Sequence, residues 1–132
     1  ENGAPLPIRE SQTEYFNSLE IVARLAPKIV HPAHGAQIRD FRATHDLYQR
    51  CFARRQQAIL SIVGNQPPAS IYAIARKLFP QLGGRAFLLD LFLAVSEVYS
   101  HLQVLSAEGR VRMEMKQEVL HAVKQLGGGI RH

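Results

Sequence analysis

The sequence predicts a mainly helical α+β fold, and three observations support this prediction. Several long segments repeat apolar residues at intervals of three and four, the spacing of one helix face. Proline or glycine follows these segments, at positions where such residues end helices. The segment "RVRMEMKQ" alternates basic and apolar side chains, which is typical of an exposed edge strand.

The first predicted helix is "SQTEYFNSLEIVARLAP". Ser11 and Glu14 have the spacing of a capping box, and Pro27 ends the helix. The expected apolar face comprises Tyr15, Leu19, Val22 and Leu25, flanked by Phe16 and Ala26. The next segment, "KIVHP", predicts a very short strand that needs neighbours from outside this chain to form a sheet.

The second predicted helix, "DFRATHDLYQRCFARRQQAILSIVG", is most regular from Thr44 and ends at Gly64. Its expected apolar side comprises Leu47, Cys51, Ala58, Ile59, Ile62 and Val63, so that Cys51 is predicted to be a small buried apolar residue. The loop "NQPPAS" leads to Ser70, which is the expected N-cap of a short helix that ends before Pro80.

The last part of the chain predicts a third long helix over residues 86–108, which ends at Gly109 and has a broad apolar surface. The segment "EVLHAVKQL" fits either the returning strand of a hairpin or a fourth helix, and "GGGIRH" reads as a frayed tail. Three helices followed by a two-stranded ribbon is the order of a winged helix, with a helix-turn-helix formed by residues 70–79 and 86–108.

Length and composition limit the class of protein. A chain of 132 residues that is 46% hydrophobic is long enough for one domain, or for a small domain and part of another. The single cysteine excludes an internal disulfide and fits a reducing compartment such as the cytoplasm. No uninterrupted apolar run reaches about 18 residues, so no membrane association is expected. The sequence opens without an initiator Met, as a fragment of a longer protein does.

The positive charge is concentrated in the second part of the chain. Residues 1–40 carry four Lys or Arg and five Asp or Glu, whereas residues 41–132 carry twelve and six, a net charge of +6. The candidate nucleic-acid contacts are Arg50, Arg54, Arg55, Arg110, Arg112 and Lys116. The 86–108 helix has no Lys or Arg, so sequence-specific DNA reading is not expected, whereas contact with a nucleic-acid backbone stays open. RNA is an expected partner only through the family resemblance given below, because some members of that family act on RNA. A solvated charged face is the simpler alternative.

The segment "KIVHPAHGAQIRD" contains the one candidate metal ligand, His34. Gly35 lets the backbone turn closely beside it, and His31 is either a helper ligand or a strand-end residue. Taken alone, these residues favour an ordinary turn histidine, because a zinc site needs three or four ligands. No nucleophile elbow or metal-binding helix motif is present, so no catalytic residue is predicted within this chain.

The chain resembles the C-terminal part of metallo-β-lactamase superfamily hydrolases with an appended winged helix. The resemblance lies in the order of four segments, which are "PAHGAQIRD", a helix carrying Tyr48, Arg55, Ile59 and Leu60, "SIYAIARKLFP" and "VYSHLQVLSAEGRV". The nearest group is that of β-lactamase-like protein 2 and hydroxyacylglutathione-hydrolase-like proteins. The resemblance covers about residues 12–115. It implies a C-terminal remnant of the catalytic domain in residues 1–40 and a winged-helix domain in residues 41–132.

The resemblance implies that His34 is a zinc ligand in the full-length parent. The family loop is Pro-Gly-His-Gly, and Ala33 here replaces its first glycine. The other ligands lie upstream in the family, so zinc is expected in the parent but not in this fragment, which is inactive alone. The implied activity is hydrolysis of an ester, thioester or phosphodiester, and the first expected partner is the protein's own upstream catalytic domain.

Two further expectations concern partners. The surplus apolar residues Phe87, Leu89 and Leu93 favour contact of the 86–108 helix with a protein surface, such as that of a second copy in a homodimer. The alternative function is a free-standing winged-helix module that binds nucleic acid or a protein partner. The "KIVHPAHG" strand and the helix before it argue against that alternative, because a winged helix has no need of them.

Overall fold

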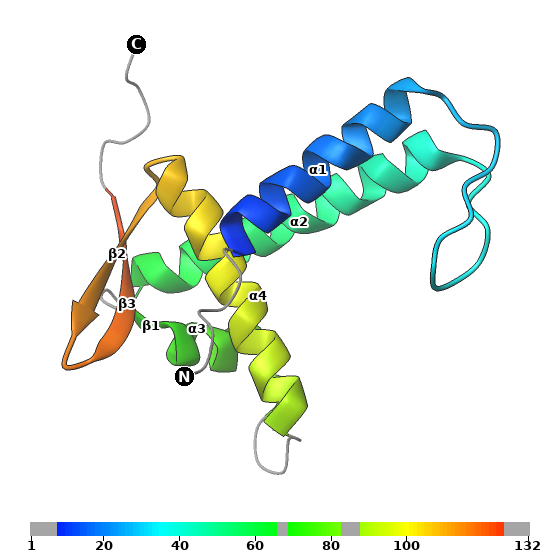
Figure 1. Cartoon of the computed structure of the whole chain (residues 1–132). Coiled ribbons are helices and arrows are strands. Elements are labelled where there is room, and N and C mark those ends of the chain that lie inside the picture. Colours follow the sequence, from blue (N-terminus) through cyan, green and yellow to red (C-terminus); the bar gives the residue numbers. More distant parts are fainter. Residues whose placement is uncertain (1–7, 66–68, 83–87, 126–132) are drawn as a thin grey trace, which may run out of the picture. The chain divides into compact units, whose positions relative to one another are not determined.

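The computed structural model describes residues 8–65, 69–82 and 88–125, excepting the side chains of residues 8–11 and 82 (Figure 1). The chain divides into two compact units, Glu1–Arg54 and Arg55–His132, and helix α2 (Phe41–Asn65) runs from the first into the second. The predicted domain boundary between residues 40 and 41 stays a prediction. The predicted tail "GGGIRH" lies outside the described residues.

The first unit contains helix α1 (Ile8–Arg24) and the part of α2 up to Arg54, which lie side by side with opposite chain directions (Figure 1). The capping-box prediction for Ser11 is wrong, because residues 8–10 extend the helix upstream and place Ser11 inside it. The helix ends before Pro27 as expected. Ala26, with a φ of 49°, already has the left-handed conformation of a turn.

The buried face of α1 differs in part from the predicted one. Tyr15 and Leu25 are 54% and 75% exposed, whereas Ala23 is buried. Leu25 is exposed because the helix ends one residue earlier. Phe16, predicted only to flank the face, meets Phe52 of α2 edge to face, with 4.6 Å between ring centroids.

The predicted apolar side of α2 is wrong in its first half, where Leu47 and Cys51 are exposed. The buried residues there are Phe41 and His45, and the inward positions 45, 52 and 59 follow one another at intervals of seven. At about 100° per residue, positions 47 and 51 lie roughly 140° and 100° around the helix from the centre of this stripe. In the second half the prediction holds, since Ile59 and Val63 are fully buried.

The second unit follows the predicted order of elements. Strand β1 (Ala69–Ser70) precedes α3 (Ile71–Leu78), a short 3-10 helix η1 (Pro80–Leu82), α4 (Leu88–Ala107) and the hairpin β2 (Val111–Lys116) and β3 (Val119–Lys124). Ser70 is the N-cap of α3, since its Oγ accepts a hydrogen bond of 3.1 Å from the Ala73 amide. Gly109, with a φ of 73°, follows the end of α4. These predicted helix ends are confirmed.

The sheet of the second unit is antiparallel, in the order β1-β3-β2. The segment "EVLHAVKQL" is therefore a strand, and "RVRMEMKQ" is the predicted edge strand. The short β1 is not predicted by the sequence. It pairs Ala69 with Ala122, which also faces Met113 of β2, so Ala122 lies at the centre of the sheet and is fully buried.

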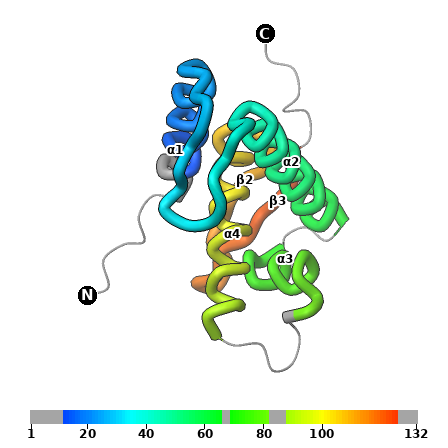
Figure 2. Tube along the Cα trace, turned by 90° about the vertical axis from the view of Figure 1, so that its right-hand side faces the viewer, coloured from blue at the N-terminus to red at the C-terminus, as the bar shows by residue number. Residues whose placement is uncertain are grey.

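The core of the second unit forms around one face of α4. Val98, Leu102 and Leu105 of this helix have no exposed surface. Figure 2 shows α3 lying beside α4, and the core they share with the end of α2 and the sheet includes Ile59, Val63, Ile74, Val111 and Ala122. The broad apolar surface predicted for this helix is thus partly explained by burial.

Within the described residues, α4 is also long and apolar enough, by length and composition alone, to cross a membrane. A core helix of a water-soluble protein meets the same criteria, and 33% of the window is buried here. This is weak evidence, and the absence of membrane association stays a prediction.

We expect Leu102→Ala to lower the free energy of unfolding by about 2–5 kcal/mol, because it leaves a cavity against fully buried neighbours. Leu47→Ala, at a 54% exposed helical position, is the matched control and should cost less than about 1 kcal/mol. Urea unfolding monitored by circular dichroism measures both. Equal losses would contradict the assigned core.

The turn of the hairpin gives a second prediction. Gln117 and Glu118 have φ values of 48° and 62°, the left-handed region that Asn and Gly accept at little cost. The double change Gln117→Asn with Glu118→Gly should therefore raise the free energy of unfolding by roughly 1 kcal/mol. Thermal unfolding tests this, and a lower melting temperature would refute the assigned turn.

Candidate functional site

The loop between α1 and α2 is closed by a single backbone pair. Val30 and Ile38 form an isolated antiparallel bridge, in which each amide donates to the carbonyl of the other residue at 2.9 Å. The predicted strand "KIVHP" is thus reduced to one paired residue. The bridge holds residues 31–37 as a closed loop, which we call the histidine loop because it carries His31 and His34.

Both imidazoles of the histidine loop are exposed to solvent. Gly35, next to His34, has a φ of 94°, in the left-handed region that favours glycine. A Cβ added to Gly35 would meet nothing within 4 Å, so the backbone conformation and not the space requires glycine here. Residues other than glycine would adopt the backbone conformation of Gly35 only with strain. His34 therefore lies on a turn that depends on the glycine next to it.

The described residues do not by themselves fit a zinc site. Among them, no three His, Cys, Asp or Glu side chains lie close enough together to hold a metal ion. A structural zinc takes four protein ligands and a catalytic zinc usually takes three. The histidine loop carries one predicted ligand, His34, and its role in metal binding stays a prediction.

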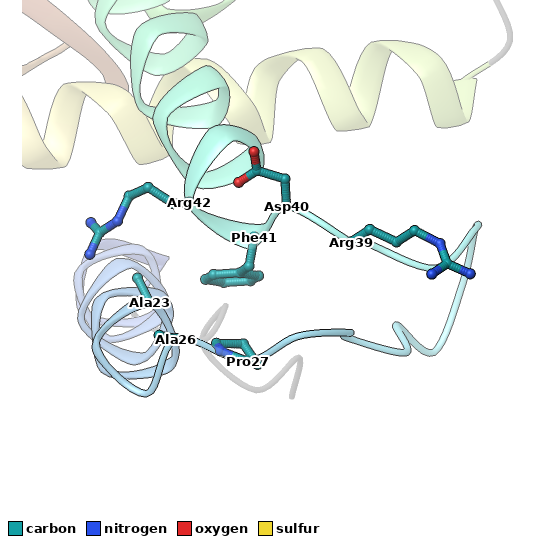
Figure 3. Close-up of a pocket in the computed structure, with 7 residues that line it drawn as sticks. All are labelled: Ala23, Ala26, Pro27, Arg39, Asp40, Phe41 and Arg42. Atoms are coloured by element: carbon teal, nitrogen blue, oxygen red, sulfur yellow. The ribbon is translucent and has the colours of Figure 1, made fainter.

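A cavity of about 270 Å³ lies at the base of this loop, lined by Ala23, Ala26, Pro27, Arg39, Asp40, Phe41 and Arg42 (Figure 3). Phe41 and Pro27 form its apolar part. The Asp40 carboxylate accepts a hydrogen bond of 3.0 Å from the Ala43 amide, which caps the start of α2. Because Asp40 has this structural role and the volume is just below that of typical ligand pockets, about 300–1,000 Å³, we assign the cavity no ligand.

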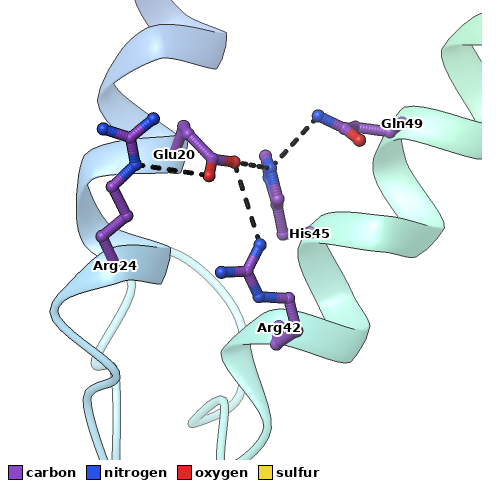
Figure 4. Close-up of polar contacts among 5 residues, drawn as sticks. All are labelled: Glu20, Arg24, Arg42, His45 and Gln49. Atoms are coloured by element: carbon purple, nitrogen blue, oxygen red, sulfur yellow. Dashed lines mark hydrogen bonds and ion pairs between the residues drawn. The ribbon is translucent and has the colours of Figure 1, made fainter.

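A carboxylate on α1 joins the two helices of the first unit (Figure 4). Glu20 Oε2 lies 3.1 Å from His45 Nε2 and 3.9 Å from an Arg42 amino nitrogen, and Glu20 Oε1 lies 3.6 Å from Arg24 Nε. Gln49 also contacts His45 Nε2, at 3.2 Å. Sequence reasoning did not identify this cluster, because Glu20 and His45 are 25 residues apart and no motif connects them.

His45 is the buried member of this cluster. Its ring is 1% exposed and stacks on Phe41 with an interplanar angle of 7°. Nδ1 is buried and has no hydrogen-bond partner among the described residues. The Glu20 carboxylate only accepts hydrogen bonds, so this contact needs a proton on Nε2, and Nε2 cannot then accept a hydrogen bond from the Gln49 amide nitrogen. The arrangement links α1 to α2, and we assign it a structural role.

Four of the six predicted nucleic-acid contacts bind carboxylates of their own chain. Arg110 lies 3.7 Å from Glu108, and both Arg112 and Lys116 lie 3.1 Å from Glu114. Arg55 binds Glu97 at 3.1 Å. The other two, Arg50 and Arg54, are exposed on α2 and have no ion pair among the described residues. The nucleic-acid prediction stays untested, but most of the cations that carry it are partly neutralised.

Arg55 belongs to a cluster in the second unit that ties α2 to α4. Its guanidinium lies 4.7 Å from the centroid of the Phe79 ring, and Glu97 also lies 3.6 Å from Nε2 of the buried His101. The hydrogen bond from His101 and the charge of Arg55 hold the pKa of Glu97 below its usual value of 4.5, against the opposing effect of burial. Arg55, Glu97 and His101 thus form one polar contact between α2 and α4.

The chain is 30% identical over 97 residues to a probable metallo-hydrolase of Bacillus subtilis (strain 168), YqjP, covering 72% of this chain and 28% of that protein. It superimposes on a β-lactamase domain protein from Burkholderia ambifaria with a TM-score of 0.74 and 21% identity, covering 84% of this chain and 32% of the other. A metallo-β-lactamase family protein from Thermus thermophilus gives a TM-score of 0.67 and 21% identity, with 86% and 33% covered. No protein-family model matches the chain.

The lowered pKa of Glu97 predicts a pH dependence of stability. A carboxylate whose folded-state pKa is depressed stabilises the fold above its unfolded value of 4.5, and this contribution is lost as the pH falls through the folded value. Urea unfolding between pH 7 and pH 3 should show stability falling below pH 4.5, and Glu97→Gln should make that fall shallower. Glu118→Gln, at an exposed turn position, should leave it unchanged. Parallel curves for Glu97→Gln and the parent chain would contradict the assignment.

Proposed function

We propose that this chain, whose curated and structural neighbours support membership of the metallo-β-lactamase superfamily, is a segment of a longer metal-dependent hydrolase. The chain spans only about 28% of the curated relative and about a third of each structural relative. In this proposal the chain supplies one metal ligand, His34, and is inactive alone. The expected metal is zinc, and the expected reaction is hydrolysis of an ester, thioester or phosphodiester.

The observation that carries this proposal is the histidine loop. It is closed by two backbone hydrogen bonds, turns at a glycine with positive φ, and exposes an imidazole, all in a chain similar to a probable metallo-hydrolase. Neutral imidazole is a common zinc ligand, and a loop held by its own bridge keeps the side chain near a defined position.

The remaining ligands, in this proposal, come from the protein's own upstream catalytic domain. Within the described residues, Val30 and Ile38 pair only with each other, so the outer edges of this bridge are open to further strands. Ile29 beside it is 41% exposed. These open edges and this apolar side chain support continuation of the bridge into a larger sheet that the rest of the protein provides.

We further propose that the second unit is the winged helix of this hydrolase. Helices α3 and α4 have the order of a helix-turn-helix. The β2-β3 hairpin, which follows α4 and pairs through β3 with the short β1, corresponds to the wing. A free-standing winged helix that binds nucleic acid is the weaker alternative, because four of its six proposed cations bind carboxylates of this chain.

The proposal is tested on the product of the complete gene, by measuring metal per chain with inductively coupled plasma mass spectrometry. We expect close to stoichiometric zinc in the parent protein, and loss of most of it in His34→Ala. His31→Ala is the matched control, because it removes an exposed imidazole from the same loop and should keep the metal.

Two results would overturn the proposal. One is a full-length product that binds no metal. The other is a His34→Ala variant that keeps as much metal as His31→Ala.

A further inference from the structure

We infer that the start of α4 is a self-association surface, occupied by a second copy of this chain. The surface, called here the α4 patch, consists of Leu88, Leu89, Phe92 and Leu93. These side chains are 86%, 65%, 65% and 55% exposed. The inference does not depend on the proposed function, since it uses only the second unit.

The four residues form one continuous apolar strip. At about 100° per residue, positions 88, 92, 89 and 93 follow one another around the helix over an arc of roughly 140°. None of the four is charged. The same arc continues along the helix as Ser96, Tyr99 and Gln103, and Gln103 donates a hydrogen bond of 2.8 Å to the Tyr99 hydroxyl. The apolar strip is therefore confined to the first part of the helix.

The core of the second unit does not require the patch. Every buried residue of α4 lies at Ala94 or beyond, and all of them except Ser100 lie on the other side of the helix. The first six residues of α4 thus extend past the buried part with their apolar side chains in solvent. Isolated exposed leucines need no explanation, but four adjacent large apolar side chains mark a contact surface.

The area of the patch matches what a symmetric dimer needs. With roughly 200 Å² for each large side chain, the four exposed fractions amount to about 500 Å² in one copy, near the upper end for the largest patch of a monomer. Two patches facing each other across a two-fold axis would bury about 1,000 Å², the lower limit for a specific interface. An uncharged apolar strip is complementary to itself, which such an interface requires.

The chemistry around the patch disfavours other occupants. Helix α4 carries no Lys or Arg, and Asp90 adds a negative charge beside the patch, so no cation of this helix is available to bind a phosphate backbone. Insertion into a bilayer needs about 20 apolar residues, and the second part of α4 is held in the core by Val98, Leu102 and Leu105. A second copy needs only the surface that is already exposed.

The test is sedimentation equilibrium of the complete gene product and of this chain, over about 5–500 µM, a range that covers weak dimers. We expect the mean mass to rise from monomer towards dimer, and Leu93→Glu to weaken the association at least tenfold. Leu47→Glu is the matched control, since Leu47 is 54% exposed and Leu93 is 55% exposed, both on helices. Circular dichroism confirms that each variant is folded.

A second variant keeps the inference testable if Leu93→Glu does not fold. Leu89→Cys in a Cys51→Ser background should be joined to a covalent dimer by a short bismaleimide, whereas Leu47→Cys in the same background should not. The inference is overturned if the chain is monomeric at all concentrations, if Leu47→Glu weakens association as much as Leu93→Glu, or if only added liposomes or nucleic acid bind the patch.

Discussion

The burial of one face of α4 is the constraint on which the second unit depends. Val98, Leu102 and Leu105 lose all contact with solvent, and the residues that cover them come from α2, α3 and the sheet. Because these contacts settle the orientation of α4, they also decide which of its residues face outward. Glu97 is brought to Arg55 and His101, and the apolar start of the helix is left exposed. The structural cluster and the proposed dimer surface are thus two consequences of the same packing.

The first unit is held together differently. Its two helices meet through the Phe16–Phe52 ring contact and through the Glu20 carboxylate, which contacts His45, Arg24 and Arg42. Beyond this hairpin, the histidine loop depends on one backbone bridge. Such a unit has few buried residues of its own, as is expected of a piece that completes its core against another part of a larger domain. The proposal of a catalytic-domain remnant accounts for this as well as for the open strand edges.

Local signals in the sequence predicted the element ends of the second unit well. Ser70, Pro80 and Gly109 act through their own backbone and neighbouring groups, so no distant residue is needed to interpret them. Predictions that depend on partners were less successful. The side of α2 that is buried in the first unit is decided by contact with α1. His45 is therefore buried, whereas Leu47 and Cys51, which were predicted to be buried, are exposed. The two-residue strand β1 exists only because Ala69 pairs with Ala122, which is far away in the chain. The histidine loop could be predicted from its own residues, because His31, His34 and Gly35 lie close together in the sequence.

In our proposal, His34 contacts a metal ion in the complete protein. A crystal structure of the full-length gene product grown with zinc would test this contact. We expect an imidazole nitrogen of His34 within about 2.0–2.1 Å of the metal, with the other ligands contributed by upstream residues. A zinc site in that structure that excludes His34, with the histidine loop facing solvent, would contradict it.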